Sequence, residues 1–521
     1  MPSLTRRFVV ATVLLNALAV RAQVIPATSA LPQKAETPQT LKVSTRIVVL
    51  DVVVTDRKGA LVTRELTRDD FTVVEDGQQQ TIRSFEPPSA HQMPAGDKAI
   101  VNSAADLKKI GDAPVTVLVL DELNSRFEDM SFSRQMLVKY LQAQPAVLKE
   151  PAVLMVAMNN SFQQIHDYTQ NRDELIEAVQ KHMPEYPWRM VNSGKAGPGA
   201  VERMAQVMAA LQQIGQASTG TAGRKNLIWV GNGFPSANLV GLDPRQADLI
   251  EAAMKRCTAR LLAARITMYL INPSASSTSV VEVDTPDDLN SSMDVNGSDP
   301  FGSGTVSFTN FAPSTGGVAF TGRNDLNNVI AEGVAKGQDY YTLSYSPTNS
   351  SEEAAKFRKI RIVMKDANLL ATTRAGYYPE AATDLNPVLD KTMSAKQVTA
   401  NLKLDLSAAL TTTISYNGLT VAATKAAGSY TIQVAENGIG WSDPGADGAQ
   451  HAEATVAAGW YDSKGKLLGH VIREETFPRG SGSAGATFTL PVALPDNVAR
   501  LRFVVRDAFS GHMGTTDLTK F

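Results

Sequence analysis

Two short polar segments follow predicted hydrophobic strands, and they hold the residues best suited to chemistry. Asp121-Glu122-Leu123-Asn124-Ser125 follows the strand 115–120, and Gly231-Asn232-Gly233 follows the strand 226–230. In a parallel sheet these segments would meet at the carboxyl edge, where open α/β sheets bind ligands. Asp121, Ser125 and Asn232 offer the hard oxygen ligands that Mg²⁺ takes. The alternative is structural, with Asp121 held by backbone amides at a helix start and Asn232 chosen for its turn geometry.

The remaining polar residues form no recognisable catalytic motif. The sequence has no G-x-S-x-G elbow, no P-loop and no strand-linked G-x-G-x-x-G. The acidic pairs Asp69-Asp70, Asp287-Asp288 and Glu352-Glu353 lie in polar turns, where such pairs are usually solvated. The histidines lack the spacing of a zinc site; they are His91, His166, His182, His451, His470 and His512. We therefore expect a protein that is not an enzyme.

The tyrosines and the single cysteine have structural interpretations as well. Tyr340-Tyr341, Tyr345 and Tyr377-Tyr378 would suit a stacking surface for a sugar or peptide. More commonly, tyrosines that alternate on strands pack a sheet face and send their hydroxyls to solvent. Cys257 lies in a predicted helix among apolar neighbours, so we expect a buried small hydrophobic residue rather than a nucleophile.

Bulk composition places the chain among globular proteins of several domains. Its 521 residues are too many for one hydrophobic core and suit two to four domains. Fifty basic and 52 acidic side chains leave a formal net charge of -2. This balance gives no reason to expect binding to nucleic acid or to an anionic membrane.

The first 22 residues are typical of a secretory signal peptide. Arg6 and Arg7 form a basic start, residues 8–20 are apolar, and Val20-Arg21-Ala22 offers a cleavage site. The apolar run is shorter than the roughly 20 residues that a membrane-spanning helix needs, so we expect cleavage and no stable membrane insertion. Residues 23–40 are rich in Pro, Ala and Thr, which predicts a disordered tether. The sequence therefore predicts export to the periplasm or the extracellular space, by either the Sec or the twin-arginine route.

Hydrophobic periodicity divides the rest of the chain into modules. Residues 41–88 alternate strands and turns and predict an N-terminal β module. Residues 112–338 alternate hydrophobic strands with amphipathic helices, which predicts a doubly wound, mostly parallel α/β sheet, with an irregular insertion at 272–307. Strands are expected at 115–120, 153–158, 226–230 and 266–271, and helices near 132–142, 172–182, 201–217 and 244–264. A β segment at 339–380 completes the middle region, and 395–521 reads as a C-terminal β-sandwich, including a strand at 412–416.

Several separated segments, taken in order, resemble one family. They are Leu50–Gly59, Asp70–Gly77, Val117–Asp121, Thr315-Gly316-Gly317, Asp339–Tyr345, Phe357–Ile360 and Ala375–Tyr378. Together they resemble the VWFA-related domain family of exported proteins known chiefly from acidobacteria, over residues 43 to 379. The resemblance implies a von Willebrand factor type A (VWA)-like domain with flanking β elements. The family carries no established reaction or ligand, so the resemblance predicts a fold and leaves the function open.

The metal-binding motif that this resemblance implies is incomplete. VWA domains that bind ligands usually carry D-x-S-x-S after the first strand, a threonine from a second loop and an aspartate after a later strand. Here Asp121 and Ser125 match the first motif, Leu123 replaces its middle hydroxyl, and Asn232 replaces the later carboxylate. No convincing threonine stands between Ser193 and Ala200. Loss of oxygens and charge weakens Mg²⁺ binding, so a degenerate metal site with no bound cofactor is expected.

Three functions remain open from the sequence. The first is a non-catalytic exported protein that contacts an unidentified protein or envelope component, with no role for nucleic acid. The second is an adhesin that depends on Mg²⁺ or another divalent cation at a divergent form of this site. The third is a hydrolase with an unrecognised site, which would need convergent titratable residues in one cleft.

Overall fold

The computed structural model describes most of the chain after residue 46. The described segments are 47–62, 64–96, 100–158, 161–183, 198–234, 237–238, 243–273, 305–348, 357–379, 386, 394–426, 428–442, 444–445, 448–479 and 485–520. They belong to one unit, residues 46–521. The predicted signal peptide, the tether and most of the insertion lie outside them. No helix in the described segments has both the length and the apolar character required to cross a membrane.

A six-stranded, mostly parallel sheet lies at the centre of the α/β region, as predicted. Its strand order is β12-β10-β8-β5-β6-β7, and β7 is the one antiparallel member. Counted along the chain from β5, this is the order 3-2-1-4-5-6 of doubly wound α/β sheets. The strands are β5 (Val115–Asp121), β6 (Val147–Met158), β7 (Ser161–Asn171), β8 (Lys225–Val230), β10 (Ile266–Ile271) and β12 (Ala319–Phe320).

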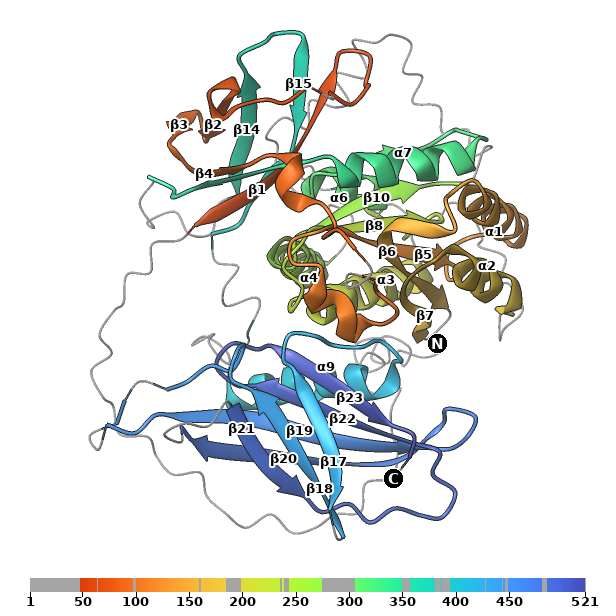
Figure 1. Cartoon of the computed structure of the whole chain (residues 1–521), viewed down its shortest axis with the longest axis vertical. Coiled ribbons are helices and arrows are strands. Elements are labelled where there is room, and N and C mark those ends of the chain that lie inside the picture. Colours follow the sequence, from red (N-terminus) through yellow and green to blue (C-terminus); the bar gives the residue numbers. More distant parts are fainter. Residues whose placement is uncertain are drawn as a thin grey trace, which may run out of the picture. The chain divides into compact units, whose positions relative to one another are not determined.

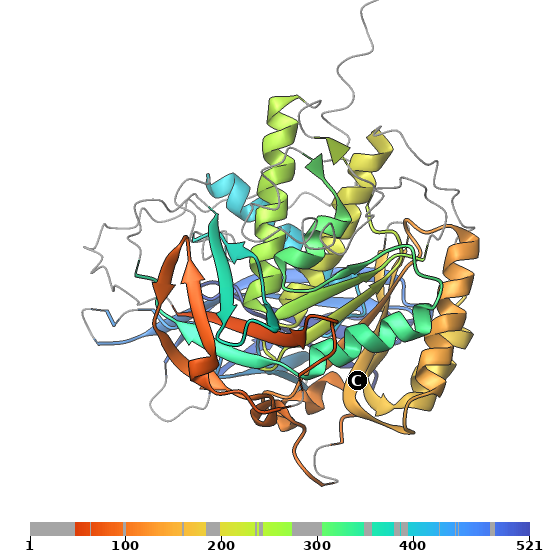
Figure 2. The ribbon, with the colours of Figure 1, turned by 90° about the horizontal axis from the view of Figure 1, so that it is seen from above.

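Helices cover both faces of this sheet because its central strands are apolar on both sides (Figures 1 and 2). In β5, Val117 and Val119 share a core with α3 and α4, whereas Leu118 and Leu120 share another with α1, α2 and α7. This alternation follows from the two-residue period of a strand. The helices are α1 (Phe127–Gln142), α2 (Arg172–Lys181), α3 (Pro198–Ala217), α4 (Pro244–Ala263), α6 (Phe308–Ser314) and α7 (Leu326–Gln338).

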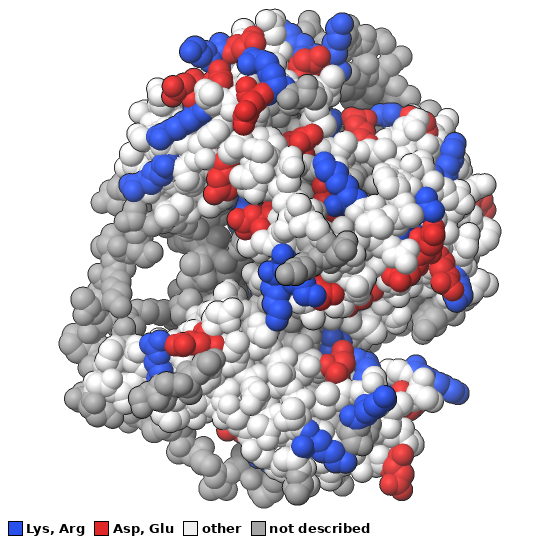
Figure 3. All heavy atoms as spheres, in the orientation of Figure 1, with Lys and Arg blue, Asp and Glu red and all other residues white. Residues whose placement is uncertain are grey.

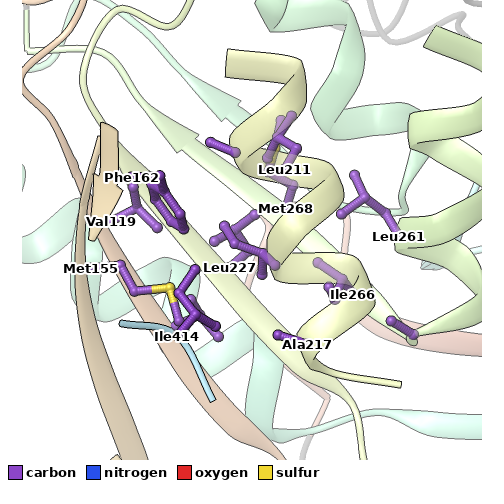
Figure 4. Close-up of a cluster of buried hydrophobic side chains, with 14 of the residues drawn as sticks. Val119, Met155, Phe162, Leu211, Ala217, Leu227, Leu261, Ile266, Met268 and Ile414 are labelled. Carbon is purple, nitrogen blue, oxygen red and sulfur yellow. The ribbon is translucent and has the colours of Figure 1, made fainter. Parts of the chain in front are cut away.

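The core on the α3 and α4 face is continuous with the C-terminal region. Figure 4 shows Leu227 and Met268 of the sheet beside Leu211 of α3 and Leu261 of α4, with Ile414 in the same cluster. Cys257 is fully buried here, as predicted, and burial raises the pKa of its thiol to about 12. A thiol in this state is a packing group rather than a nucleophile.

The N-terminal strands pair with strands that follow α7. Antiparallel sheets of order β15-β1-β13-β4 and β16-β14-β2-β3 enclose one apolar core. The strands are β1 (Val48–Asp56), β2 (Phe71–Glu75), β3 (Gln78–Gln80), β4 (Ile82–Glu86), β13 (Tyr341–Tyr345), β14 (Arg358–Met364), β15 (Leu369–Thr372) and β16 (Gly376–Tyr377). Within the described segments, short 3₁₀ helices lie at Arg68–Asp70 and Pro88–His91, and another at Ala104–Lys109 packs against the core of the α/β domain. Two segments nearly 300 residues apart in the chain thus build one β module.

A buried carboxylate organises this module and corrects the expectation that its tyrosine hydroxyls point to solvent. Glu75 is fully buried and accepts hydrogen bonds from Arg358 Nη1 at 3.0 Å and from the Tyr377 hydroxyl at 3.2 Å. The Tyr345 hydroxyl is a third donor. The hydroxyls of Tyr345 and Tyr377 therefore satisfy a buried charge inside the module, and a ligand-stacking surface is not formed by these rings.

The described residues of the C-terminal region form one helix and two antiparallel sheets. Sheet β17-β18-β21 and sheet β20-β19-β22-β23 share an apolar core, as a β-sandwich requires. The elements are α9 (Ala395–Thr411), β17 (Val421–Ala426), β18 (Ser429–Ala435), β19 (His451–Tyr461), β20 (Leu467–Pro478), β21 (Gly485–Leu490), β22 (Arg500–Asp507) and β23 (Met513–Leu518).

The strand predicted at Thr412–Tyr416 does not form. Its backbone carbonyls serve a different purpose, because the fully buried Arg502 guanidinium donates to the carbonyls of Thr412 and Ile414. The Thr412 and Thr413 hydroxyls bond in turn to the backbone of β7 at Phe162 and Gln164. The carbonyls and hydroxyls of this segment therefore bond to a buried cation and to an edge strand, and the segment does not pair as a strand.

The Glu75 cluster gives a stability prediction. Glu75→Ala leaves Arg358 buried without its carboxylate, so we expect the free energy of unfolding to fall by about 3 to 5 kcal/mol. Glu436→Ala, which removes the exposed partner of Arg479, should cost about 0 to 1 kcal/mol. Urea denaturation of both variants checks the contrast, and equal losses would contradict the role assigned to Glu75.

Candidate functional site

The register of the central sheet brings the two predicted polar segments together. Leu120 of β5 lies opposite Val230 of β8 in a parallel ladder, so Asp121 and Gly231 leave adjacent strand ends. Asp121 and Ser125 are almost completely buried, and Asn232 is partly buried. The three predicted site residues therefore converge at the carboxyl edge of the sheet, as the sequence indicated.

The Asp121 carboxylate accepts hydrogen bonds from protein N–H groups on both oxygens. Oδ2 accepts from the Gly233 amide at 2.7 Å and from the Trp229 indole at 3.2 Å. Oδ1 accepts from the Asn124 amide at 3.1 Å and from the Asn124 side chain at 3.5 Å. The carboxylate thus ties the end of β5 to the loop that follows β8.

Two glycines allow the loop to approach this carboxylate. Gly231 has φ +150°, and a Cβ there would lie 2.3 Å from Asp121 Cβ and 2.8 Å from Ser125 Oγ. Gly233 has φ +62°, and a Cβ there would lie 1.9 Å from the Phe308 ring of α6. Only glycine combines this space with a left-handed backbone. The Gly-Asn-Gly sequence is therefore explained by the geometry of the loop.

Ser125 and Asn124 complete the network. Ser125 Oγ accepts from the Asn232 amide at 3.2 Å, and Asn232 Nδ2 donates to the Asn124 carbonyl at 3.4 Å. Asn124 is about 1% exposed, and its Oδ1 has no hydrogen-bond partner. The network holds the two segments together, and Asn124 Oδ1 remains as a buried acceptor without a donor.

Burial dominates the protonation of Asp121. Removal from water raises the pKa of this carboxyl from 3.8 to about 6, although the N–H donors from Asn124, Trp229 and Gly233 oppose the shift. The carboxylate form accepts every one of these bonds, so the network favours the ionised group at neutral pH. Asp121 therefore exists as a hydrogen-bonded anion above this pKa.

These residues do not fit the metal that the family resemblance implies. A divalent cation needs several free hard oxygens, and Mg²⁺ demands a near-octahedral set of them. Here N–H donors occupy both oxygens of Asp121, and Ser125 Oγ already accepts a backbone N–H. Within the described segments, no three His, Cys, Asp or Glu side chains are grouped so that they would hold a metal. Most of the region expected to lack the threonine ligand, 193–200, lies outside those segments.

A second polar cluster beside Asp121 did not emerge from the sequence. Glu122 Oε1 lies 3.1 Å from His182 Nε2 and 3.6 Å from Arg134 Nη1, and its side chain is only 4% exposed. Arg134 also donates to the Val179 and His182 carbonyls at the end of α2. The cluster joins β5, α1 and α2. In the sequence, only the position of Glu122 next to Asp121 could have pointed to this cluster, since His182 is 60 residues away in the chain.

Exposed apolar side chains flank this edge of the sheet. Phe127, two residues after Ser125, is 50% exposed, and Met183, next to His182, is 77% exposed. Both exceed what a side chain of this size shows in a core. The edge thus combines a closed polar network with an apolar rim.

Of the other acidic pairs, Asp69-Asp70 lies in the described segments, and Asp70 has a structural role. Asp70 accepts from the backbone amide and hydroxyl of Thr67 at 2.8 and 3.0 Å, a capping arrangement that lowers the pKa of its carboxyl. The pairs Asp287-Asp288 and Glu352-Glu353 lie outside the described residues.

Comparisons with known proteins give structural likenesses, and the two described below have low TM-scores. No family model matches the sequence, and no curated protein matches it. The SpRpn10 VWA domain is similar at 16% identity, over 30% of this chain and 74% of that chain, with a TM-score of 0.17. The three N-terminal domains of the type V pili tip protein Mfa5 from Porphyromonas gingivalis are similar at 10% identity, over 93% and 77%, with a TM-score of 0.18. These scores carry no argument, so the fold assignment rests on the strand order of the chain itself.

The donor set gives a metal-removal prediction. Asp121→Ala leaves the Trp229 and Gly233 donors without an acceptor, so we expect a loss of about 3 kcal/mol in the free energy of unfolding. The melting temperatures of the wild type and the variant should each be the same in EDTA and in millimolar Mg²⁺. The exposed Asp69→Ala serves as the control. A Mg²⁺-dependent rise in the wild type that Asp121→Ala abolishes would contradict the metal-free network.

The raised pKa of Asp121 gives a pH prediction with a definite sign. Between pH 3.8 and about 6 the folded state binds more protons at Asp121 than the unfolded state, so stability falls as pH rises through this window. Relative to Asp121→Asn, which cannot titrate, the wild type should lose about 3 kcal/mol from pH 3.5 to pH 7. Urea denaturation across this range measures the difference, and a pH-independent difference would contradict the assignment.

Proposed function

We propose that this chain is an exported, non-catalytic binding protein whose α/β domain contacts a protein partner of the cell envelope through the carboxyl edge of its sheet. The observation that carries the proposal is the exposure of Phe127 and Met183 beside the closed Asp121 network. Both side chains lie where open α/β sheets take their ligands, which supports a contact at this edge.

The hydrogen bonds of the edge support binding over chemistry. Asp121 and Ser125 already accept hydrogen bonds from N–H groups of the protein, and Glu122 contacts His182 and Arg134. A catalytic group must be able to reach a substrate proton or carbonyl. For the same reason the metal-dependent adhesin is less well supported than a metal-independent contact.

Charge supports a protein partner over a polyanion. The formal net charge is -2. On the face seen in Figure 3, acidic and basic side chains are interspersed and no broad field of one sign is visible. Nucleic-acid binding relies on a basic patch or stripe. An apolar anchor with a polar surround is instead the usual anatomy of a protein interface.

The amino-terminal sequence supports export. Residues 1–22 have the basic, apolar and small-residue order of a signal peptide, and residues 23–40 have the composition of a flexible tether. Cleavage after Ala22 would place the start of the mature chain at Gln23, in the periplasm or outside the cell.

Capture from the envelope fraction tests the proposal with matched variants. Mature wild type, the double variant Phe127→Ser/Met183→Ser, and Val147→Ser are each used as bait. Val147 is 60% exposed but begins β6, at the amino edge of the sheet. We expect wild type and Val147→Ser to retain the same partner and the double variant to lose it by at least about tenfold, since apolar anchors often contribute more than 1.4 kcal/mol.

Equal melting temperatures of the three baits serve as the folding control. Undiminished capture by the double variant would show that the contact lies elsewhere and would overturn the proposal.

A further inference from the structure

Buried cations gather at the amino edge of the central sheet, opposite the site described above. Arg224 and Lys225 precede or begin β8 and are each about 1% exposed. Arg265 precedes β10 and is partly exposed. Two carboxylates act on these cations electrostatically, Asp51 of β1 and Asp112, and Asp51 is bonded to Arg265 Nη2 at 2.6 Å. In the described part of the chain, no carboxylate lies within ion-pair distance of Arg224 or Lys225.

Several N–H groups of this cluster are buried without an acceptor. They are Nε and Nη1 of Arg224 and Nε of Arg265, and the ring nitrogen Nδ1 of His91 is likewise buried without a hydrogen-bond partner. Arg224 makes one side-chain hydrogen bond, from Nη2 to the Tyr269 hydroxyl at 3.0 Å, and its guanidinium lies 5.1 Å from the centre of the Tyr340 ring. Native proteins leave few buried donors unpaired, so a group of them requires a physical explanation.

These polar groups lie around two side chains, that of Tyr340, which precedes β13, and that of Thr342, which belongs to β13. The His91 ring stacks on Tyr340 with centroids 4.4 Å apart. His91 Nε2 lies 3.0 Å from Thr342 Oγ1, a contact in which either atom can be the donor, and Thr342 Oγ1 accepts from Arg265 Nη2 at 3.0 Å. Arg224 and Arg265 therefore approach Tyr340 and Thr342 from the α/β domain, whereas His91 and Asp51 belong to the β module.

Lysine and arginine respond differently to this environment. Burial, and to a lesser extent the positive charge of Arg265, lower the pKa of Lys225 to about 7. The Lys225 amine can therefore lose its proton near neutral pH. Arg224 cannot do the same because a guanidinium stays protonated in proteins. A buried charge without a counter-charge close to it destabilises the folded state. The ring of Tyr340 offers only a partial compensation.

We propose that the Arg224 cluster, formed by Arg224, Arg265 and His91 around Tyr340 and Thr342, binds a small monovalent anion, with chloride as the physiological occupant. A halide accepts several N–H bonds without a fixed geometry. It also places a negative charge next to the Arg224 guanidinium, which has no carboxylate within ion-pair distance in the described segments. Because Arg224 and Tyr340 are almost fully buried, the occupant must be small enough to be held without its water shell.

The anion would join two parts of the fold. Its donors come from the β module at His91 and from the α/β domain at Arg224 and Arg265, so it stabilises the packing between them. Chloride would then act as a structural cofactor of the exported protein, independent of the Asp121 edge and of its partner.

Thermal melting at constant ionic strength tests the proposal. Replacing sodium gluconate by sodium chloride should raise the wild-type melting temperature by at least about 2 °C, because a ligand bound only to the folded state stabilises it. Arg224→Met removes the charge and should show no chloride response, whereas Arg473→Met, an exposed site on β20, should keep it. An identical response of wild type and Arg224→Met would overturn the proposal.

Bromide diffraction decides the question without a variant. Crystals of the mature protein equilibrated with sodium bromide should show an anomalous peak within about 4 Å of the Arg224 guanidinium, the reach of N–H contacts to a halide. No peak there, as expected if ordered water alone satisfies these donors, would overturn the proposal even if Arg224→Met failed to fold.

Discussion

The acceptance of N–H bonds by the buried Asp121 carboxylate is the interaction on which the carboxyl edge of the sheet depends. A carboxylate taken out of water needs compensating donors, and four N–H contacts from Asn124, Trp229 and Gly233 supply them. Those contacts require the close loop approach that Gly231 and Gly233 permit. The loop in turn carries Asn232 to Ser125. Each feature of the edge thus follows from one buried charge and the geometry that satisfies it.

The chain handles buried charge in three different ways. Asp121 is surrounded by neutral N–H donors, and Glu75 is paired with a guanidinium and two tyrosine hydroxyls. Arg224 has neither a carboxylate within ion-pair distance in the described segments nor a full set of acceptors. The first two arrangements are complete within the protein. The third is incomplete, and this difference is what separates a structural charge from a candidate ligand site.

The sequence was informative where the pattern is local. The helices at 127–142, 172–181, 198–217 and 244–263 and the central strands lie close to their predicted positions, because apolar periodicity and length specify them. Strand β7 was missed because an edge strand with one covered face carries many polar residues, as Ser-Phe-Gln-Gln-Ile-His does. The pairing of β1 with β13 was also out of reach, since no local pattern reports a partner nearly 300 residues away. At the site, strand position predicted the convergence of Asp121, Ser125 and Asn232, whereas the Trp229 donor depends on a side-chain direction that the sequence does not specify.

The most direct test of the central claim is a crystal structure of the mature protein grown in millimolar Mn²⁺, with data collected at the manganese edge. Mn²⁺ takes the same oxygen ligands as Mg²⁺ and has a strong anomalous signal. The metal-free network predicts no anomalous peak at the carboxyl edge, with Asp121 Oδ2 within hydrogen-bond distance of Gly233 N and Trp229 Nε1. A peak about 2.2 Å from an Asp121 oxygen, with the Trp229 indole displaced, would contradict it.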